Sequence, residues 1–236
     1  MQRVRLSVII PVYNEEQTIT EVIERVITVD LGPIEREVII ADDGSTDATG
    51  KLVDANHFLQ DGRIRVQHSP INLGKGAAVR LGLSVATGDI LLIQDADLEL
   101  DPGEYGALLQ PILDGQADIV YGSRFLRRAG GVPRKTRAAN VFLTFLTNVL
   151  FGGRLTDMET AYKVFRREAL DGIRLRCVGF DFEPEITARF LQRGYRILEV
   201  PITYNPRRID EGKKMRFVDG LDAIYTLLKC RFSGNR

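Results

Sequence analysis

The chain has few residues of the kinds that stabilise secreted or zinc-binding proteins. Only two of its 236 residues are cysteines, Cys177 and Cys230, and they lie far apart without a CxxC pair. The two histidines, His57 and His68, have no metal-ligand spacing, and we interpret both as structural. These features argue against a disulfide framework or a structural zinc site, and they favour a reducing, cytoplasmic location.

An excess of one charge and a long apolar run are also missing. Lysine plus arginine (32) balance aspartate plus glutamate (32), so bulk charge gives no reason to expect a nucleic acid partner. No run reaches the roughly 18 to 20 apolar residues that span a bilayer. No signal peptide is expected, because Pro11, Asn14 and Glu15 interrupt the apolar stretch near the start. If the protein meets a membrane, we expect it to lie on the cytoplasmic face.

Short apolar runs alternate with amphipathic stretches along the chain. They predict strands at residues 6–10, 38–41, 64–66, 90–93, 119–121 and 196–200. They also predict helices at 18–29, 76–86, 104–113, 138–151, 183–193 and 217–232. Because the strands are continuous apolar runs between helices, we expect an α/β fold with a mostly parallel sheet and helices on both faces. The last helix and the one at 138–151 are amphipathic. No linker or repeat divides residues 1–236, which we interpret as one domain.

Two carboxylates follow the apolar strand predicted at 90–93, in the triplet Asp95-Ala96-Asp97. Side chains two residues apart in extended backbone point the same way, and like charges held together need a cation or a proton. Mg²⁺ or Mn²⁺ would serve, because these ions use one or two carboxylates plus substrate phosphates. Glu99 could complete the metal site. The alternative is a solvated turn in which Asp97 caps the next helix.

A second pair of acids, Asp42-Asp43, follows the strand predicted at 38–41 and precedes Gly44 and Ser45. Acids after strands bind ribose or base groups in dinucleotide folds, and ligands of parallel sheets bind at the carboxyl ends of the strands. We therefore expect these acids and Asp95 to converge on one edge of the sheet. One of the two neighbouring acids is expected to be structural, with Ser45 in a turn.

Known phosphate-binding signatures are absent. No G-x-G-x-x-G follows a strand, and no G-x-x-x-x-G-K-[ST] occurs. The segment Asn72-Leu-Gly-Lys-Gly76 is similar to a phosphate loop only superficially, because its second glycine follows the lysine. Residues 9–16 lack the glycine-rich loop of a sugar-nucleotide pyrophosphorylase, which argues against that function.

Six motifs nevertheless occur in one characteristic order. They are Ser7-Val-Ile-Ile-Pro-Val-Tyr-Asn-Glu15, Asp42-Asp-Gly-Ser-Thr-Asp-Ala-Thr49, Asn72-Leu-Gly-Lys-Gly76, Gly88-Asp89, Gln94-Asp-Ala-Asp97 and Gly122-Ser-Arg124. This ordered set resembles the family-two inverting glycosyltransferases of GT-A fold, and among them the dolichyl- or polyprenyl-phosphate mannosyl- and glucosyltransferases. The resemblance covers residues 4–125 tightly and extends more loosely through 157–166 and 180–185.

The resemblance implies a nucleotide-binding pocket formed by Pro11, Tyr13, Glu15, Ala41 and Asp43. For Tyr13 the alternative is packing in the core. In the family, this pocket holds the base and ribose of a nucleotide-sugar donor, here UDP- or GDP-linked. Residues 1–125 would then be the donor half of the enzyme, and residues 126–236 the acceptor half.

The resemblance also implies that Asp95, Ala96 and Asp97 form the site for Mg²⁺ or Mn²⁺ and the diphosphate. Glu99 stands where relatives often carry glutamine, so a third metal-binding carboxylate is predicted there. Arg124 is implied as a catalytic ligand of the donor phosphate or sugar. A metal ion and an arginine both stabilise the charge of a nucleoside diphosphate leaving group. The alternative for Arg124 is a surface ion pair.

The acceptor implied by the resemblance is a polyprenyl or dolichyl phosphate. Such a phosphate is already anionic, so it needs cations rather than a general base. Two basic clusters could hold it, and their members are Arg134, Lys135, Arg137, Arg207, Arg208, Lys213 and Lys214. The alternative is that these clusters are solvated surface. The predicted helices at 138–151 and 217–232 lie beside them, and either pack on the core or lie on an anionic membrane.

The segment Asp157-Met-Glu-Thr-Ala-Tyr-Lys-Val-Phe165 resembles the glucosyl-type pattern Asp-x-x-x-Gly-(Phe/Tyr)-Lys, with Ala161 in place of glycine. The match assigns Lys163 to the ligand site and favours glucose over mannose. Two other functions stay open. A hydroxyl acceptor would need a general base, for which Asp181 or Glu183 is a candidate, although acids at a helix start are ordinary. The chain could also be a non-catalytic nucleotide-sugar-binding module that docks to a membrane partner.

Overall fold

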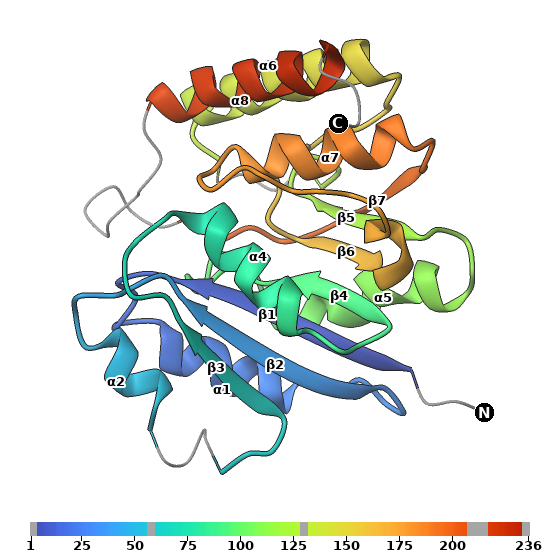
Figure 1. Cartoon of the computed structure of the whole chain (residues 1–236). Helices are drawn as coiled ribbons and strands as arrows, with labels where there is room; N and C mark the ends of the chain where they lie inside the picture. Colours follow the sequence, from blue (N-terminus) through green and yellow to red (C-terminus); the bar gives the residue numbers. More distant parts are fainter. Residues whose placement is uncertain (1–3, 56–59, 128–131, 207–216, 233–236) are drawn as a thin grey trace.

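The computed structural model describes residues 4–55, 60–127, 132–206 and 217–232, and its strands form one sheet (Figure 1). The strands are β1 (Arg5–Val12), β2 (Glu35–Asp42), β3 (Ile64–His68), β4 (Ile90–Ile93), β5 (Ile119–Ser123), β6 (Lys163–Arg166) and β7 (Ile197–Pro201). Their order across the sheet is β3-β2-β1-β4-β6-β5-β7. The six predicted strands are confirmed. The mostly parallel sheet is confirmed as well.

Strand β6 was not predicted, and it is the antiparallel member of the sheet. It lies between β4 and β5, with Phe165 opposite Leu91 and Val164 opposite Val120. The strand has only four residues, and only Val164 and Phe165 are apolar. So short an apolar run gives no periodic signal, and the partners on either side determine the strand.

Helices cover both faces of the sheet, as predicted. They are α1 (Ile19–Thr28), α2 (Thr49–Val53), α4 (Lys75–Val85), α5 (Tyr105–Leu113), α6 (Arg134–Phe151), α7 (Phe182–Gln192) and α8 (Phe217–Phe232), with short turns η1 (Pro102–Glu104) and η2 (Arg167–Leu170). Alternate residues of each strand point to opposite faces. Val8 therefore packs in the core formed with α1, α2 and α5, whereas Ile9 packs in the core formed with α4 and α7.

Helices α6 and α8 form a further layer over α7 (Figure 1). Leu143 of α6 and Leu227 of α8 are buried against Ala188 of α7 in a small third core. One face of each helix therefore packs on the protein. None of the described helices is long and apolar enough to cross a membrane.

The opposite faces of α6 and α8 expose large apolar side chains to solvent. We call this set the apolar face, and it consists of Phe142, Phe145 and Val149 of α6 with Leu221, Tyr225, Leu228 and Phe232 of α8. Phe145 is 63% exposed and Phe232 is 78% exposed. The members recur at helical spacing, so each helix is apolar on both its core side and its outer side.

Candidate active site

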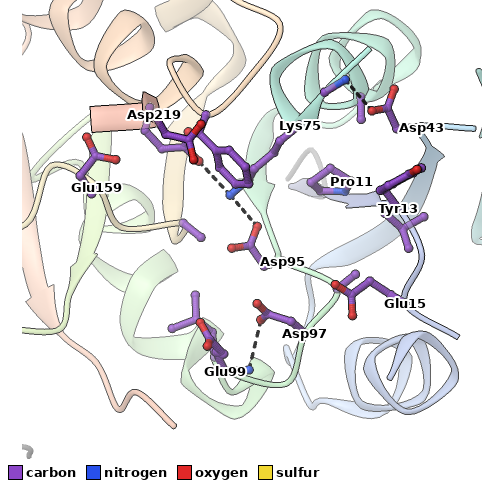
Figure 2. Close-up of a pocket in the computed structure, with 18 of the residues that line it drawn as sticks. Pro11, Tyr13, Glu15, Asp43, Lys75, Asp95, Asp97, Glu99, Glu159 and Asp219 are labelled. Atoms are coloured by element: carbon purple, nitrogen blue, oxygen red, sulfur yellow. Dashed lines mark hydrogen bonds and ion pairs between the residues drawn. The ribbon is translucent and has the colours of Figure 1, made fainter. Parts of the chain in front are cut away.

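A cavity of about 720 Å³ opens at the carboxyl ends of β1, β2 and β4 (Figure 2). One side, which we call the sheet-edge side, is lined by Pro11, Tyr13, Glu15 and Asp43. The other, which we call the helical side, is lined by Thr136 and Asn140 of α6, Glu159, Glu183 of α7 and Asp219 of α8. Asp95, Asp97, Glu99 and Arg124 also line the cavity. The predicted convergence of acids on one edge of the sheet is therefore present.

The turns after β1 and β4 contain non-glycine residues in the left-handed region. Asn14 has φ 51° and Leu98 has φ 46°. Asn14 is supported by its neighbours, because its backbone N–H donates to Ser45 Oγ at 3.0 Å and its side chain accepts from the Thr46 N–H at 2.8 Å. A left-handed leucine costs roughly 1–2 kcal/mol. Such strain persists where the surrounding structure enforces it, and here it turns the chain between Asp97 and Glu99.

Of the two acids at the end of β2, Asp43 faces the cavity and Asp42, the last residue of the strand, is structural. Asp42 accepts hydrogen bonds from the Ser45 N–H at 3.0 Å and pairs with His68 Nδ1 at 2.9 Å. Asp43 accepts from the backbone N–H of Leu73 at 3.0 Å and of Gly74 at 2.6 Å. Burial raises the pKa of Asp43, although these two bonds oppose the rise. The cavity wall is thus connected to the loop before α4.

Gly74 allows that loop to pack closely against the segment before α7. Its φ is +107°, and an added Cβ would lie 2.5 Å from the carbonyl oxygen of Val178. Glycine adopts such a conformation without the penalty that a side chain brings. The close approach places Lys75, the first residue of α4, in the cavity wall.

Lys75 is the central cation of the cavity, and the sequence analysis did not assign it a role. Its Nζ is 2.8 Å from Asp95 Oδ1 and 2.8 Å from Glu183 Oε1 (Figure 2). Burial lowers the pKa of Lys75, but the two carboxylates outweigh burial and hold the pKa well above its ordinary value. Lys75 lies in the Asn72–Gly76 motif, so the motif order was the signal that could have identified it.

The predicted metal ligands do not form a three-carboxylate group. Asp95 pairs with Lys75, and Glu99 Oε2 accepts a hydrogen bond from the Tyr204 hydroxyl at 2.9 Å. Asp97 Oδ1 accepts from the Glu99 N–H at 3.2 Å. Within the described ranges, no three His, Cys, Asp or Glu side chains are grouped so that they could hold a metal ion. Asp95 and Asp97 still provide the one or two carboxylates that Mg²⁺ or Mn²⁺ uses beside phosphate oxygens.

The charge of the cavity also fits a cation. Among the described residues that line it, eight are acidic and two, Lys75 and Arg124, are basic. Both basic side chains are already paired with carboxylates. A diphosphate entering this acidic cavity would meet like charge, and a bound cation would reduce that repulsion.

Arg124 belongs to a buried ion pair rather than to a surface one. Its Nε and Nη2 are each 2.7 Å from the Asp157 carboxylate, which is fully buried. The guanidinium also lies over the rings of Phe125 and Tyr204, at 5.7 Å and 5.4 Å from the centroids. Within the described part of the chain, Arg124 makes its side-chain hydrogen bonds through Nε and Nη2 and none through Nη1. Arg124 lines the cavity with a fixed orientation and one nitrogen available for a phosphate oxygen.

Lys163 does not line the cavity. The residue is fully buried in β6, where its Nζ donates to the carbonyl oxygen of Met158 at 3.0 Å and to that of Thr160. The ammonium also lies 4.7 Å from the centroid of the Tyr121 ring. Burial lowers the pKa of Lys163 to about 8. Lys163 holds the loop before β6 through these two carbonyl groups, and the structure does not bring it to the cavity.

Four further predicted residues lie away from the cavity or outside the described ranges. Ala41 is buried within β2, opposite Pro11 of β1. Arg137 is exposed on the first turns of α6, with its guanidinium 5.6 Å from the centroid of the Phe125 ring. Arg207 and Lys213 lie outside the described residues.

Glu159 is a cavity residue that the sequence analysis did not single out. Burial raises the pKa of Glu159 to about 8, and the neighbouring Glu183 carboxylate acts in the same direction. Glu183 was a candidate base, and it lines the cavity. Asp181, the other candidate, accepts from the Gly179 N–H at 3.0 Å and lines a separate cavity.

Comparisons with known proteins agree with this geometry. Residues 7–174 match the family described as Glycosyl transferase family 2. The chain is 32% identical over 223 residues to polyprenol monophosphomannose synthase of Mycolicibacterium smegmatis, covering 89% of this chain and 80% of that protein. It is 30% identical over 212 residues to dodecaprenyl-phosphate galacturonate synthase of Rhizobium johnstonii. This match covers 88% of this chain and 61% of that protein.

Two further likenesses are more limited. Glycosyltransferase AglD of Haloferax volcanii is 30% identical over 214 residues, but the chain spans only 34% of that protein. The crystal structure of glucosyl-3-phosphoglycerate synthase from Mycobacterium tuberculosis, in complex with Mn²⁺, UDP and phosphoglyceric acid, aligns with a TM-score of 0.74 and 24% identity. The alignment covers 97% of this chain and 79% of that structure, and at this identity it shows the shared fold alone.

Proposed function

Because the chain belongs to glycosyl transferase family 2 and is a glycosyltransferase, we propose that it transfers a hexose from UDP-glucose or GDP-mannose to a polyprenyl or dolichyl phosphate. The acidic cavity at the carboxyl ends of β1, β2 and β4 is the observation that carries the proposal. The cavity is large enough for a nucleotide, and two of the aspartates that line it, Asp95 and Asp97, follow β4. Two relatives whose names include a polyprenyl-type acceptor support this choice of acceptor.

In the proposed donor complex, the nucleoside lies on the sheet-edge side against Pro11, Tyr13, Glu15 and Asp43. Asp95 and Asp97 would hold Mg²⁺ or Mn²⁺, which when bound neutralises the diphosphate and stabilises it as a leaving group. The manganese ion named for the M. tuberculosis structure is consistent with such a metal.

Arg124 and Lys75 are the protein's own cations near the proposed diphosphate. Asp157 orients the Arg124 guanidinium, so that Nη1 can donate to a phosphate oxygen without reorganisation. The Nζ of Lys75 lies 2.8 Å from the Asp95 carboxylate and balances its charge. Arg124 thereby positions the diphosphate, and Lys75 lowers the energetic cost of the clustered acids.

The acceptor is proposed to react as an anion. A phosphate oxygen attacks the anomeric carbon on the face opposite the nucleoside diphosphate, forming one carbon–oxygen bond as the other breaks, which inverts the configuration. No proton has to be removed from a lipid phosphate at neutral pH, so no general base is required. A hydroxyl acceptor would need one, and of the two candidates only Glu183 lines the cavity.

The apolar face supports a proposed peripheral contact with the cytoplasmic face of a membrane. Its aromatic and leucine side chains project from α6 and α8, and Arg134 and Lys135 are exposed at the start of α6. A helix with apolar residues flanked by basic ones suits the interface of an anionic bilayer. Thr136 and Asn140, near the start of α6, also line the cavity, so a lipid phosphate bound there could extend its chain along α6.

The experiment is a transfer assay on the purified chain with labelled UDP-glucose or GDP-mannose, Mn²⁺ or Mg²⁺, and matched acceptors. Polyprenyl phosphate should accept the label, whereas the same polyprenol without phosphate should not. Transfer to the alcohol instead would favour a hydroxyl acceptor. Donor binding without transfer to either acceptor would favour the non-catalytic module.

A further inference from the structure

The helical side of the cavity contains acids whose role the proposed function leaves open. Figure 2 shows Glu159 and Asp219 on the opposite side of the Lys75–Asp95 pair from Pro11 and Tyr13. If the nucleoside occupies the sheet-edge side and the diphosphate lies near Asp95, the sugar must lie toward these residues. The chemistry of the helical side therefore determines which sugars the donor can carry.

Two carboxylate oxygens on the helical side are buried without a hydrogen-bond partner among the described residues. They are Oε1 of Glu159 and Oε2 of Glu183. Glu183 is only 4% exposed, and its other oxygen is bound by Lys75. Leaving a buried polar atom unpaired costs roughly 1–3 kcal/mol, more when the group is charged. Because both residues line the cavity, a ligand with hydroxyl donors would satisfy these atoms.

The cations near this side are already neutralised. Lys75 contacts both Asp95 and Glu183, and Arg124 is held by the buried Asp157. The helical side thus offers hydrogen-bond acceptors but lacks a spare positive charge among the described residues. A neutral hexose presents several hydroxyl donors to such a surface. A hexuronate would add a carboxylate beside carboxylates, which is unfavourable.

We propose that Glu159 and Glu183 form the subsite for the sugar hydroxyl groups of the donor, and that this subsite selects neutral hexoses and rejects hexuronates. The proposal rests on the proposed function, because it places the nucleoside diphosphate of that function on the sheet-edge side. It assigns Glu159 a direct contact with the donor sugar.

The test measures equilibrium binding by calorimetry with Mn²⁺, at a constant pH above about 8 so that Glu159 is ionised, for ligands that share one nucleoside diphosphate. The two series are UDP, UDP-glucose and UDP-glucuronate, and GDP, GDP-mannose and GDP-mannuronate. Each sugar pair differs only at C6, as CH₂OH or carboxylate. The nucleoside diphosphate that binds selects the series. We expect the hexose to bind at least tenfold more tightly than its hexuronate, since one charged hydrogen bond corresponds to roughly a tenfold effect.

Two variants then assign the effect to the named residues. Glu159→Gln and Glu183→Gln each replace one acceptor oxygen by an amide NH₂. Each should weaken hexose binding roughly tenfold relative to binding of the nucleoside diphosphate by the same variant. This ratio removes any effect that Glu183→Gln has through Lys75 on Asp95. Glu168→Gln, at an exposed glutamate outside the cavity, is the matched control and should change neither affinity. The diphosphate affinity also reports whether each variant folds.

The outcomes separate this proposal from the proposed function. Equal binding of hexose and hexuronate would overturn the subsite while leaving the donor site intact. Unchanged hexose affinity in both glutamine variants would do the same. Failure of every nucleoside diphosphate to bind with Mn²⁺ would overturn the proposed function, and the subsite with it.

Discussion

The sheet-edge side of the cavity is formed by residues that directly follow strands, whereas its helical side is assembled from α6, α7, α8 and the loop before β6. On the first side, Tyr13 and Asp43 take their positions from the strand that each follows. On the second, Glu159 and Asp219 line the same cavity only because segments far apart in the sequence pack together in the fold. The difference separates what local sequence determines from what tertiary packing determines.

The largest expected effect on hexose transfer is at Asp97, which lies between the sheet-edge side and the helical side of the cavity. Asp97→Asn keeps the shape of the side chain but removes a charge that the proposed metal needs. We expect kcat for hexose transfer to fall by roughly 100-fold or more, which is the scale for loss of electrostatic stabilisation of a leaving group. Steady-state kinetics at saturating Mn²⁺ measure it. Asp101→Asn, at an exposed acid outside the cavity, is the control. Undiminished transfer by Asp97→Asn would remove the metal role of this residue.

The second effect concerns the connection between the loop before α4 and α7. Gly74→Ala places a Cβ 2.5 Å from the Val178 carbonyl oxygen at a positive φ, so the loop must shift. We expect a loss of more than about 1 kcal/mol in the free energy of unfolding. Gly32→Ala also has a positive φ but no atom within 4 Å of the added Cβ. Denaturant titration of both variants should show the larger loss for Gly74→Ala, and equal losses would disprove the packing argument.

A third effect concerns the apolar face. Replacing Phe142 and Phe145 by serine should weaken binding to vesicles that contain anionic lipid by about tenfold or more, since burial of each ring contributes roughly 1.5–3 kcal/mol. Co-sedimentation with vesicles measures the change. Leu113→Ser removes an exposed apolar side chain from α5 and is the control. Equal vesicle binding by the phenylalanine variant and the control would refute the membrane contact.

The smallest effect is a pH dependence of stability at Glu159. Burial and the Glu183 carboxylate raise its pKa to about 8, while Lys163, Arg124 and Asp157 also face it. Between about pH 4.5 and 8 the folded protein therefore binds a proton that the unfolded chain has lost. Linkage requires that this contribution to stability falls as pH rises through that window.

Thermal melts between pH 5 and 8 test this prediction. The wild type should lose stability relative to Glu159→Gln as pH rises, because glutamine has no proton to lose. Burial lowers the pKa of Lys163 to about 8, so its titration changes the pH dependence of stability only above this window. A constant difference between the two proteins from pH 5 to 8 would contradict the raised pKa.

The same comparison explains which parts of the fold and site were predictable. Asp95, Asp97 and Asp43 were identified because each follows an apolar strand, and parallel strands bring their carboxyl ends to one edge. Strands β1, β2, β4 and β5 were predicted from largely continuous apolar runs. Strand β6 was missed because its four residues become a strand only between β4 and β5.

The differences between the predicted and the observed site have the same origin. Lys163 matched a sequence pattern, but the antiparallel strand that contains it buries its ammonium beneath the loop. Lys75 and Glu159 were missed because their partners, Asp95 and Glu183, lie far away in sequence. Glu99 was expected on a metal, yet it bonds Tyr204, which is 105 residues further along the chain. Contacts between residues so far apart in the sequence cannot be predicted from local sequence patterns.

The measurement that tests the central claim most directly is hexose transfer to polyprenyl phosphate by the purified chain, before and after removal of divalent metal with a chelator. The account predicts that transfer stops on chelation and returns when Mn²⁺ or Mg²⁺ is added back, because the acidic cavity needs a cation to accept a diphosphate. Transfer that continues at full rate without divalent metal would contradict it.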